Sequence, residues 1–212
     1  MKYPPVGVID YGAGNIASIV GALESVGADV ARISKPEHVM DFESVVIPGV
    51  GSFGSAMRRL RASGMIPPLI EAVASGRYIL GICLGMQLLF ADSDEDGGQL
   101  GLGVLSGSVS RFTPEPSESL PVPHIGFNNV TAPEESILFQ GITPGADFYF
   151  AHSHRVPLSE RSQPLLLSTA NYGGPFVASL EYKSTVFGVQ FHPELSQTNG
   201  RRLLWNFVTA SC

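Results

Sequence analysis

The chain has few of the residues that mark disulfide-stapled, metal-binding and membrane proteins. Its two cysteines, Cys83 and Cys212, are far apart, and no CxxC pair or histidine-rich cluster occurs, so neither a disulfide framework nor a metal site is expected. No apolar run approaches the roughly 18 residues of a membrane span, and the start lacks the charged and apolar regions of a signal peptide. We therefore expect a cytoplasmic protein that does not cross a membrane.

Positive charge is also scarce. Lys and Arg number 13 against 19 Asp and Glu, a net charge of −6, which argues against a nucleic-acid partner. A chain of 212 residues is long enough to bury roughly 70% of its unfolded surface around one core. We expect a single domain over residues 1–212.

Residues 77–90 carry the most informative pattern in the chain. A run that is apolar on both faces, typical of a central parallel strand, ends abruptly at Cys83, and strong helix formers follow over residues 84–90. Gly81 and Gly85 stand two residues before and after Cys83, as a strained nucleophile elbow requires. A cysteine that merely fills space in the core is the alternative, but it would not need these glycines. We predict that Cys83 is a reactive thiol at a helix N-terminus.

A cysteine nucleophile needs a base and a group that orients the base. Among the five histidines, His192 is distinguished by its neighbours: it follows an apolar strand and precedes Pro193, which forces an extended backbone. Residues i and i+2 of an extended chain point the same way, so Glu194 can accept one ring N–H while the other ring nitrogen faces Cys83. The order Cys83, His192, Glu194 predicts a catalytic triad.

Two further segments are expected beside Cys83. Gly49, Val50 and Gly51 follow an apolar strand one βα unit before the elbow, and their backbone can turn N–H groups toward an oxyanion; an ordinary turn is the alternative. Residues 91–101 are acidic, and we choose Glu95 to pair with a substrate ammonium, although such carboxylates are often only solvated.

Near the start of the chain, Gly12, Gly14 and Ala17 match the dinucleotide fingerprint G-x-G-x-x-G/A. The acidic residue that should follow about 20 positions later is missing, and Lys35 stands where it could face the extra phosphate of NADP. A tight turn between strand and helix explains the glycines without a ligand. We expect no cofactor.

The order of the predicted elements indicates an α/β fold. Strands and helices alternate up to about residue 100, as in an open, mostly parallel twisted sheet with flanking helices. Short strands and turns then dominate to residue 191, and we expect them to be antiparallel additions that extend the first sheet. A helix over residues 199–210 should close the chain.

Three segments together carry a resemblance to a known family. GICLGMQ at residues 81–87, FHPE at 191–194 and PGVG at 48–51 resemble the class I glutamine amidotransferases, and the resemblance spans nearly the whole chain. It implies a flavodoxin-like sheet and the hydrolysis of L-glutamine to glutamate and ammonia through a thioester on Cys83. The residues expected to hold glutamine and the oxyanion are Gly49, Val50, Gly51, Leu84, Gln87, Glu95, Ser153 and His154.

Within this family, DYGAGN at residues 10–15 and Met86 are similar to glutaminase subunits that pass ammonia to a (βα)8-barrel cyclase in histidine biosynthesis. A heterodimer with such a cyclase is therefore expected. Phe127 and His154 stand where the family usually has Trp and Tyr. Two alternatives remain: the chain supplies ammonia to a different synthase, such as one that modifies nucleotide-linked sugars, or it binds NADP at the glycine motif.

Overall fold

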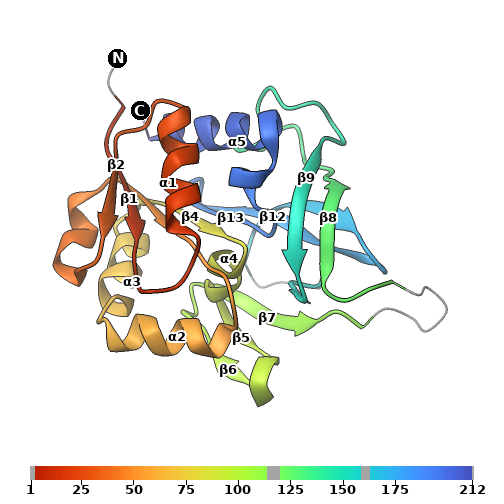
Figure 1. Ribbon diagram of the computed structural model, residues 1–212, viewed down its shortest axis with the longest axis horizontal. Helices are drawn as coiled ribbons and strands as arrows, with labels where there is room; N and C mark the ends of the chain where they lie inside the picture. The colour runs from red at the N-terminus through yellow and green to blue at the C-terminus, as the bar shows by residue number, and fades with distance from the viewer. Residues whose placement is uncertain (1–2, 114–119, 159–162, 212) are drawn as a thin grey trace.

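The computed structural model describes residues 3–113, 120–158 and 163–211, so Cys212 lies outside the described part (Figure 1). The helices are α1 (Ile16–Ser25), α2 (Phe53–Ala62), α3 (Ile66–Ala74), α4 (Leu84–Leu88) and α5 (Gln197–Ala210), with 3-10 turns η1 (Pro36–Asp41), η2 (Glu95–Gly97) and η3 (Pro193–Leu195). The strands are β1 (Val6–Ile9), β2 (Val30–Ile33), β3 (Ser44–Ile47), β4 (Tyr78–Ile82), β5 (Phe90–Ser93), β6 (Gln99–Leu100), β7 (Leu105–Arg111), β8 (His124–Asn129), β9 (Asp147–His152), β10 (His154–Arg155), β11 (Leu166–Asn171), β12 (Pro175–Tyr182) and β13 (Val186–Val189).

A seven-stranded sheet forms the centre of the described chain, in the order β11-β12-β13-β4-β3-β1-β2. The strands from β13 to β2 run parallel, and β12 and β11 add an antiparallel edge. Every residue of β1, β3 and β13 is buried, because helices cover both faces of a parallel sheet. The predicted open, mostly parallel sheet is confirmed.

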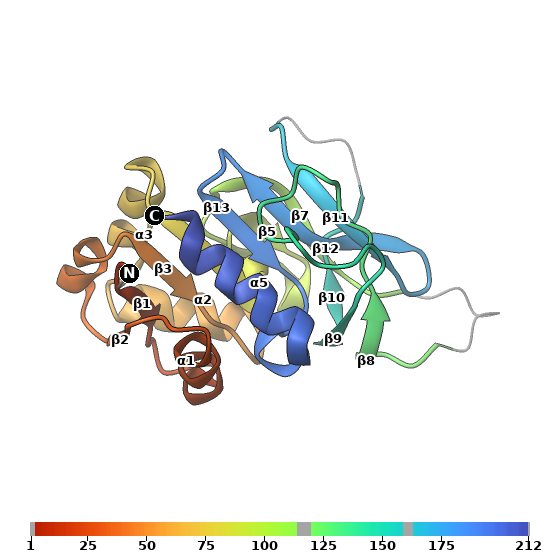
Figure 2. The same ribbon diagram turned by 90° about the horizontal axis from the view of Figure 1, so that it is seen from above.

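Alternate residues of the central strands pack into two separate hydrophobic cores, one on each face of the sheet. Val8 of β1 packs in one core with Leu23 of α1 and Phe207 of α5. Its neighbour Ile9 packs in the other core with Leu60 of α2. Figures 1 and 2 show the same division, with α1 and α5 over one face of the sheet and α2 and α3 over the other. The period of two along each strand therefore produces a three-layer sandwich.

The later strands differ from the prediction that they all extend the first sheet. The strands β11, β12 and β13 join it, but β10, β7, β5 and β6 form a second, four-stranded sheet, and β8 pairs only with β9. In β8 and β7 buried residues are interspersed with exposed ones. A strand with a solvent face cannot lie in the middle of a sheet that is covered on both sides, so these strands build their own layers beside it.

The helix after Cys83 is shorter than the predicted residues 84–90, because α4 ends at Leu88. Phe90 instead begins β5, pairs with Leu105 of β7 and is fully buried. Strand pairing and burial of a phenylalanine outweigh the local preference for helix. No helix in the described ranges has the length and apolar content needed to cross a membrane.

Candidate active site

Cys83 lies at the turn between β4 and α4, at the carboxyl edge of the parallel strands. Its backbone has φ 53° and ψ −110°, which a non-glycine residue adopts only when its surroundings hold it there. The surroundings include a 2.7 Å hydrogen bond from the Cys83 N–H to the carbonyl of Val189. The predicted strand, strained turn and helix are thus present, although the helix is brief.

Glycines allow the elbow to pack against the neighbouring strand end. A Cβ at Gly81 would lie 2.7 Å from the backbone of Gly85, and a Cβ at Gly85 would collide with the carbonyl oxygen of Ile47. Gly49 is in a similar position, since a Cβ there would lie 2.7 Å from the nitrogen of Gly85. The loop that follows β3 therefore lies directly on the start of α4.

His192 and Glu194 come together as predicted, but by a different backbone. His192 is extended, whereas Pro193–Leu195 form the 3-10 turn η3, which brings Glu194 back to the ring. His192 follows β13, which pairs with β4 so that Val189 is opposite Ile82. The Nδ1 atom of His192 is 2.8 Å from Oε1 of Glu194, whose side chain is only 3% exposed. Burial alone would lower the pKa of His192, but hydrogen bonds and charges from Cys83 and Glu194 outweigh it and raise the pKa to about 10. The raised pKa favours the protonated imidazole at neutral pH.

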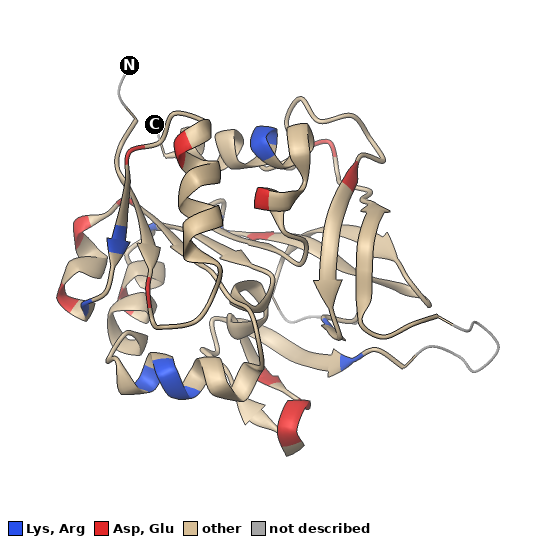
Figure 3. Cartoon of the chain, viewed as in Figure 1, with Lys and Arg blue, Asp and Glu red and all other residues tan. Residues whose placement is uncertain are grey.

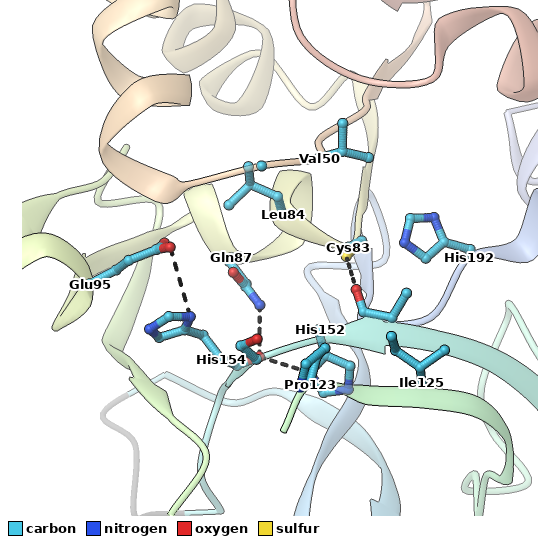
Figure 4. Close-up of a pocket in the computed structure, with 13 residues that line it drawn as sticks. Val50, Cys83, Leu84, Gln87, Glu95, Pro123, Ile125, His152, His154 and His192 are labelled. Atoms are coloured by element: carbon cyan, nitrogen blue, oxygen red, sulfur yellow. Dashed lines mark hydrogen bonds and ion pairs between the residues drawn. The ribbon is translucent and has the colours of Figure 1, made fainter. Parts of the chain in front are cut away.

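The loop of residues 49–51 leaves the sheet beside the elbow, since β3 and β4 are paired neighbours. Gly51 has φ 93°, a conformation that favours glycine, and it lies just before the start of α2. Val50 is 45% exposed at the mouth of the site, and Figure 4 shows it on the same side as Leu84 and Cys83. The loop therefore lies beside Cys83, and its oxyanion role stays a prediction.

A cavity of about 300 Å³ opens at the elbow (Figure 4). Its wall brings together nine of the residues that the sequence predicts for the site: Val50, Gly51, Cys83, Leu84, Gln87, Glu95, Ser153, His154 and His192. Two predicted residues support this wall from outside. Gly49 lies against Leu84, and Glu194 lies against the ring of His192.

Glu95 lines the cavity, but its carboxylate already has protein partners. One oxygen accepts the Phe53 N–H at 2.7 Å, which satisfies a free N–H in the first turn of α2. The other lies 3.9 Å from Nδ1 of His154. Glu95 thus ties the start of α2 to the cavity wall, and its pairing with a substrate ammonium stays a prediction.

Gln190 belongs to the site, and the sequence interpretation missed it. Its Nε2 lies 3.7 Å from the sulfur of Cys83, and its Oε1 accepts a 2.9 Å hydrogen bond from Nε2 of Gln87. The signal available in the sequence was its position, because Gln190 is a polar residue between the apolar strand Val186–Val189 and His192.

Ser153 and His154 form the wall opposite the elbow, where Ser153 joins β9 to β10 and His154 begins β10. The carbonyl of Ser153 accepts the Phe112 N–H at 2.9 Å. The carbonyl of His154 accepts Nε2 of Gln87 at 3.0 Å and Nδ1 of His152 at 2.8 Å. This backbone is therefore held rigidly in place by protein hydrogen bonds.

The glycine motif near the start of the chain packs against the strand end beside the elbow. Gly14 has φ 108°, and a Cβ there would lie 3.3 Å from Cβ of Pro48. The Gly12 N–H donates to Asp10 at 3.2 Å, and the Gly12 carbonyl accepts from Arg59 at 2.6 Å. The glycines thus have a structural use that needs no dinucleotide.

The fold and this cavity are those of a class I glutamine amidotransferase. The model of the family "Glutamine amidotransferase class-I" matches residues 7–210, so the chain belongs to this family. The subunit "Imidazole glycerol phosphate synthase subunit HisH" of Moorella thermoacetica is 40% identical over 203 residues, covering 96% of this chain and 93% of the relative. The protein of the same name from Desulfitobacterium hafniense is 42% identical over 202 residues, covering 95% and 92%.

Solved structures share the fold at lower identity. A structure titled "Crystal structure of glutamine amidotransferase" has a TM-score of 0.75 and 20% identity, covering 97% of this chain and 98% of the other. PurLQS from Thermotoga maritima has a TM-score of 0.74 and 18% identity, covering 98% of both chains. These likenesses bear on the fold alone.

Proposed function

We propose that this chain is the glutaminase subunit of an imidazole glycerol phosphate synthase and that Cys83, His192 and Glu194 are its catalytic triad. The observation that carries the proposal is the 2.8 Å contact between His192 and Glu194 beside a strained, buried cysteine. The pKa of about 10 for His192 implies an imidazolium beside the sulfur, a pairing that activates a thiol as a nucleophile. The names and identities of the relatives support this choice of enzyme.

The first half-reaction cleaves the carboxamide of glutamine. The thiolate of Cys83 attacks the carboxamide carbon and forms a C–S bond, and the carbonyl oxygen becomes an oxyanion. The N–H of Leu84 and an N–H from residues 49–51 stabilise that charge. His192 then donates its proton to the amide nitrogen, the C–N bond breaks, and ammonia leaves behind a thioester.

The second half-reaction restores the enzyme. A water attacks the thioester carbon, and His192, now neutral, accepts the proton of the water. The C–S bond breaks, so glutamate leaves and Cys83 returns to the thiolate beside a protonated His192. Glu194 holds the imidazole in one orientation and stabilises its charge in both half-reactions.

Glutamine is held in the cavity by the groups opposite the elbow. Glu95 lines the cavity, and its carboxylate pairs with the substrate ammonium in addition to accepting the Phe53 N–H. Gln87 and the backbone of Ser153 and His154 line the rest of the wall and offer polar groups to the substrate. The cavity of about 300 Å³ is at the small end of the range for ligand sites, as suits an amino acid.

The partner is a (βα)8-barrel cyclase that covers the mouth of the cavity and receives the ammonia. Apolar side chains surround this mouth: Val50 is 45% exposed and Ile125 is 63% exposed, and both line the cavity. Phe127 stands two residues after Ile125 on β8, points the same way and is 50% exposed. Exposed apolar groups clustered around a catalytic mouth are expected to be buried by a partner.

The test is to co-express the chain with a barrel cyclase from the same genome, purify the pair and measure the formation of imidazole glycerol phosphate. The complex should use glutamine or added ammonium salt, and Cys83→Ala should abolish only the glutamine-dependent reaction. Loss of both reactions in Cys83→Ala would count against the role of the thiol. Failure of the two chains to associate would favour a different synthase as the acceptor.

The whole chain acts as one amidotransferase domain in this proposal, because the oxyanion loop, Cys83 and the pair of His192 and Glu194 come from the first, middle and last thirds of the sequence. We also place the protein in the cytoplasm, since Cys83 must remain a reduced thiol to attack glutamine.

A further inference from the structure

We propose that Gln190 is a further catalytic group, whose side-chain N–H donates to the sulfur of Cys83 and stabilises the thiolate. The inference deepens the proposed function and rests on Cys83 being the nucleophile. Gln190 follows β13, its side chain is fully buried, and its Nε2 is 3.7 Å from the sulfur. A buried thiolate needs donors close by, because burial without them favours the neutral thiol.

The surrounding hydrogen bonds decide which end of the Gln190 amide faces the sulfur. A backbone carbonyl can only accept, so the 3.0 Å contact with the carbonyl of His154 requires the nitrogen of Gln87 at that point. The same Gln87 nitrogen donates to Gln190 over 2.9 Å, which requires the Gln190 oxygen there. The nitrogen of Gln190 is left to face Cys83.

The carbonyl of His154 is itself held by a directional chain of imidazoles below the cavity. His152 donates from Nδ1 to this carbonyl at 2.8 Å, so its Nε2 must accept from Nδ1 of His124 at 3.0 Å. His124 in turn accepts at Nε2 from Asn128 at 3.4 Å. Burial lowers the pKa of His124 to about 4, and it is the main cause of the lowering of the His152 pKa to about 3. Both rings are therefore neutral at neutral pH, which fixes the direction of the hydrogen bonds along this chain.

The Gln190 N–H matters because other groups near the sulfur favour either the thiol or the thiolate of Cys83. The carbonyl of Ala151 lies 4.0 Å from the sulfur and can interact favourably only with the protonated thiol. His192 and Gln190 favour the thiolate. Two other titratable groups lie near this pair: the phenol of Tyr11 interacts with the charge of the sulfur, and Glu194 contacts the ring of His192. When the thioester intermediate collapses, the same Gln190 N–H stabilises the departing thiolate.

The first experiment measures the reactivity of the Cys83 sulfur directly. Gln190→Met removes the donor at similar length, and Gln190→Glu keeps an acceptor for Gln87 but places oxygen at the sulfur. Iodoacetamide labelling of Cys83, followed by mass spectrometry of its peptide over a range of pH, reports thiolate reactivity in the absence of glutamine. We expect labelling to be about tenfold slower at neutral pH in both variants, and the pH dependence of its rate to move to higher pH. This is the effect of losing one charge-assisted hydrogen bond to the thiolate.

Turnover of the complex provides the second readout. The kcat for glutamine should fall about tenfold in Gln190→Met while KM stays within about twofold, because the donor acts on the nucleophile rather than on the bound substrate. Gln87→Met, which leaves residue 190 intact but frees its amide to rotate, should slow labelling by a smaller factor. Ser179→Ala is the matched control. Among the described residues, the buried hydroxyl of Ser179 on the adjacent β12 has no hydrogen-bond partner, so its loss should change neither readout.

Wild-type labelling rates and pH profiles in Gln190→Met, Gln190→Glu and Gln87→Met would overturn the inference. Slower labelling in Ser179→Ala as well would also overturn it, because general loosening of the sheet would then explain the effect. A complex in which Cys83→Ala still hydrolyses glutamine would refute the proposed function instead, and the labelling data would still report whether Gln190 contacts the sulfur.

Discussion

The phenolic hydroxyl of Tyr11 donates a 2.8 Å hydrogen bond to the carbonyl of Pro48 and so joins the loop after β1 to the loop after β3. Burial, with a further contribution from the charge of Cys83, raises the pKa of Tyr11 well above its ordinary value. The phenol therefore keeps its proton and remains a donor. Pro48 directly precedes Gly49, where the proposed oxyanion loop begins, so this bond fixes the base of that loop.

Tyr11→Phe is expected to lower the kcat of the complex about fivefold to tenfold with little change in KM, because the oxyanion donors lose their fixed position. The free energy of unfolding should fall by about 1 to 2 kcal/mol, since the Pro48 carbonyl loses a buried partner. Steady-state kinetics and urea denaturation measure the two effects. An unchanged kcat would mean that the loop is held without Tyr11.

Glu194→Gln is expected to cost less activity than His192→Ala. The glutamine can still contact the imidazole but carries no charge, whereas removal of His192 takes away the group that transfers protons, a loss of about 10² to 10⁴ in kcat. Glutamate release by each purified complex gives the comparison. If Glu194→Gln were the more damaging change, Glu194 would have to act directly in proton transfer.

His192 should titrate near pH 10 in the folded protein and at lower pH in Cys83→Ala, which removes the hydrogen bond and charge of the sulfur. Because the pKa is raised on folding, protonation of His192 stabilises the fold fully below pH 6.5, and this contribution is lost as the pH rises toward about 10. NMR of the imidazole nitrogens measures the titration. Equal values in the two proteins would place the thiolate outside hydrogen-bond range.

Acid should destabilise the protein through the buried pair of His124 and His152. Their pKa values of about 4 and about 3 lie below those of unfolded histidines, so the unfolded state binds more protons as the pH falls below 6.5. The free energy of unfolding should therefore decline between pH 6.5 and about 4. Denaturation at several pH values, with NMR of both rings, measures this, and protonation of either ring near pH 6.5 would contradict it.

Gly85→Ala is expected to destabilise the protein by about 3 kcal/mol or more, because its Cβ would collide with the carbonyl of Ile47 at the elbow. Gly21→Ala is the matched control. Nothing lies within 4 Å of a Cβ at Gly21, which is exposed on α1, so alanine should stabilise that helix by about 0.5 to 1 kcal/mol. Thermal denaturation of both variants measures these changes. A Gly85→Ala protein as stable as the wild type would show that the elbow accepts a side chain at this position.

Some features of the site could be predicted from the sequence because they depend on local geometry. The elbow at Cys83 needs an apolar strand and two glycines at fixed spacing, and all of these lie within a few residues of each other. His192 has the extended backbone expected before a proline, but Glu194 reaches its ring from within the 3-10 turn η3 and not along an extended chain. The family resemblance supplied the expected substrate for these groups.

Other features depend on contacts between distant segments. The helix after Cys83 stops at Leu88 because Phe90 pairs with Leu105, and no local signal marks that pairing. The second sheet likewise arises because strands with a solvent face cannot enter a sheet that is covered on both sides.

The chain by itself therefore determined a cysteine elbow, a histidine with its carboxylate and a mostly parallel sheet, since spacing and periodicity govern local backbone and side-chain direction. Only the tertiary structure decided that Tyr11 holds Pro48 and that the amide of Gln190 presents nitrogen to Cys83. The orientation of that amide depends on donors and acceptors contributed by several separate strands and loops. Those groups meet only after the sheets have packed.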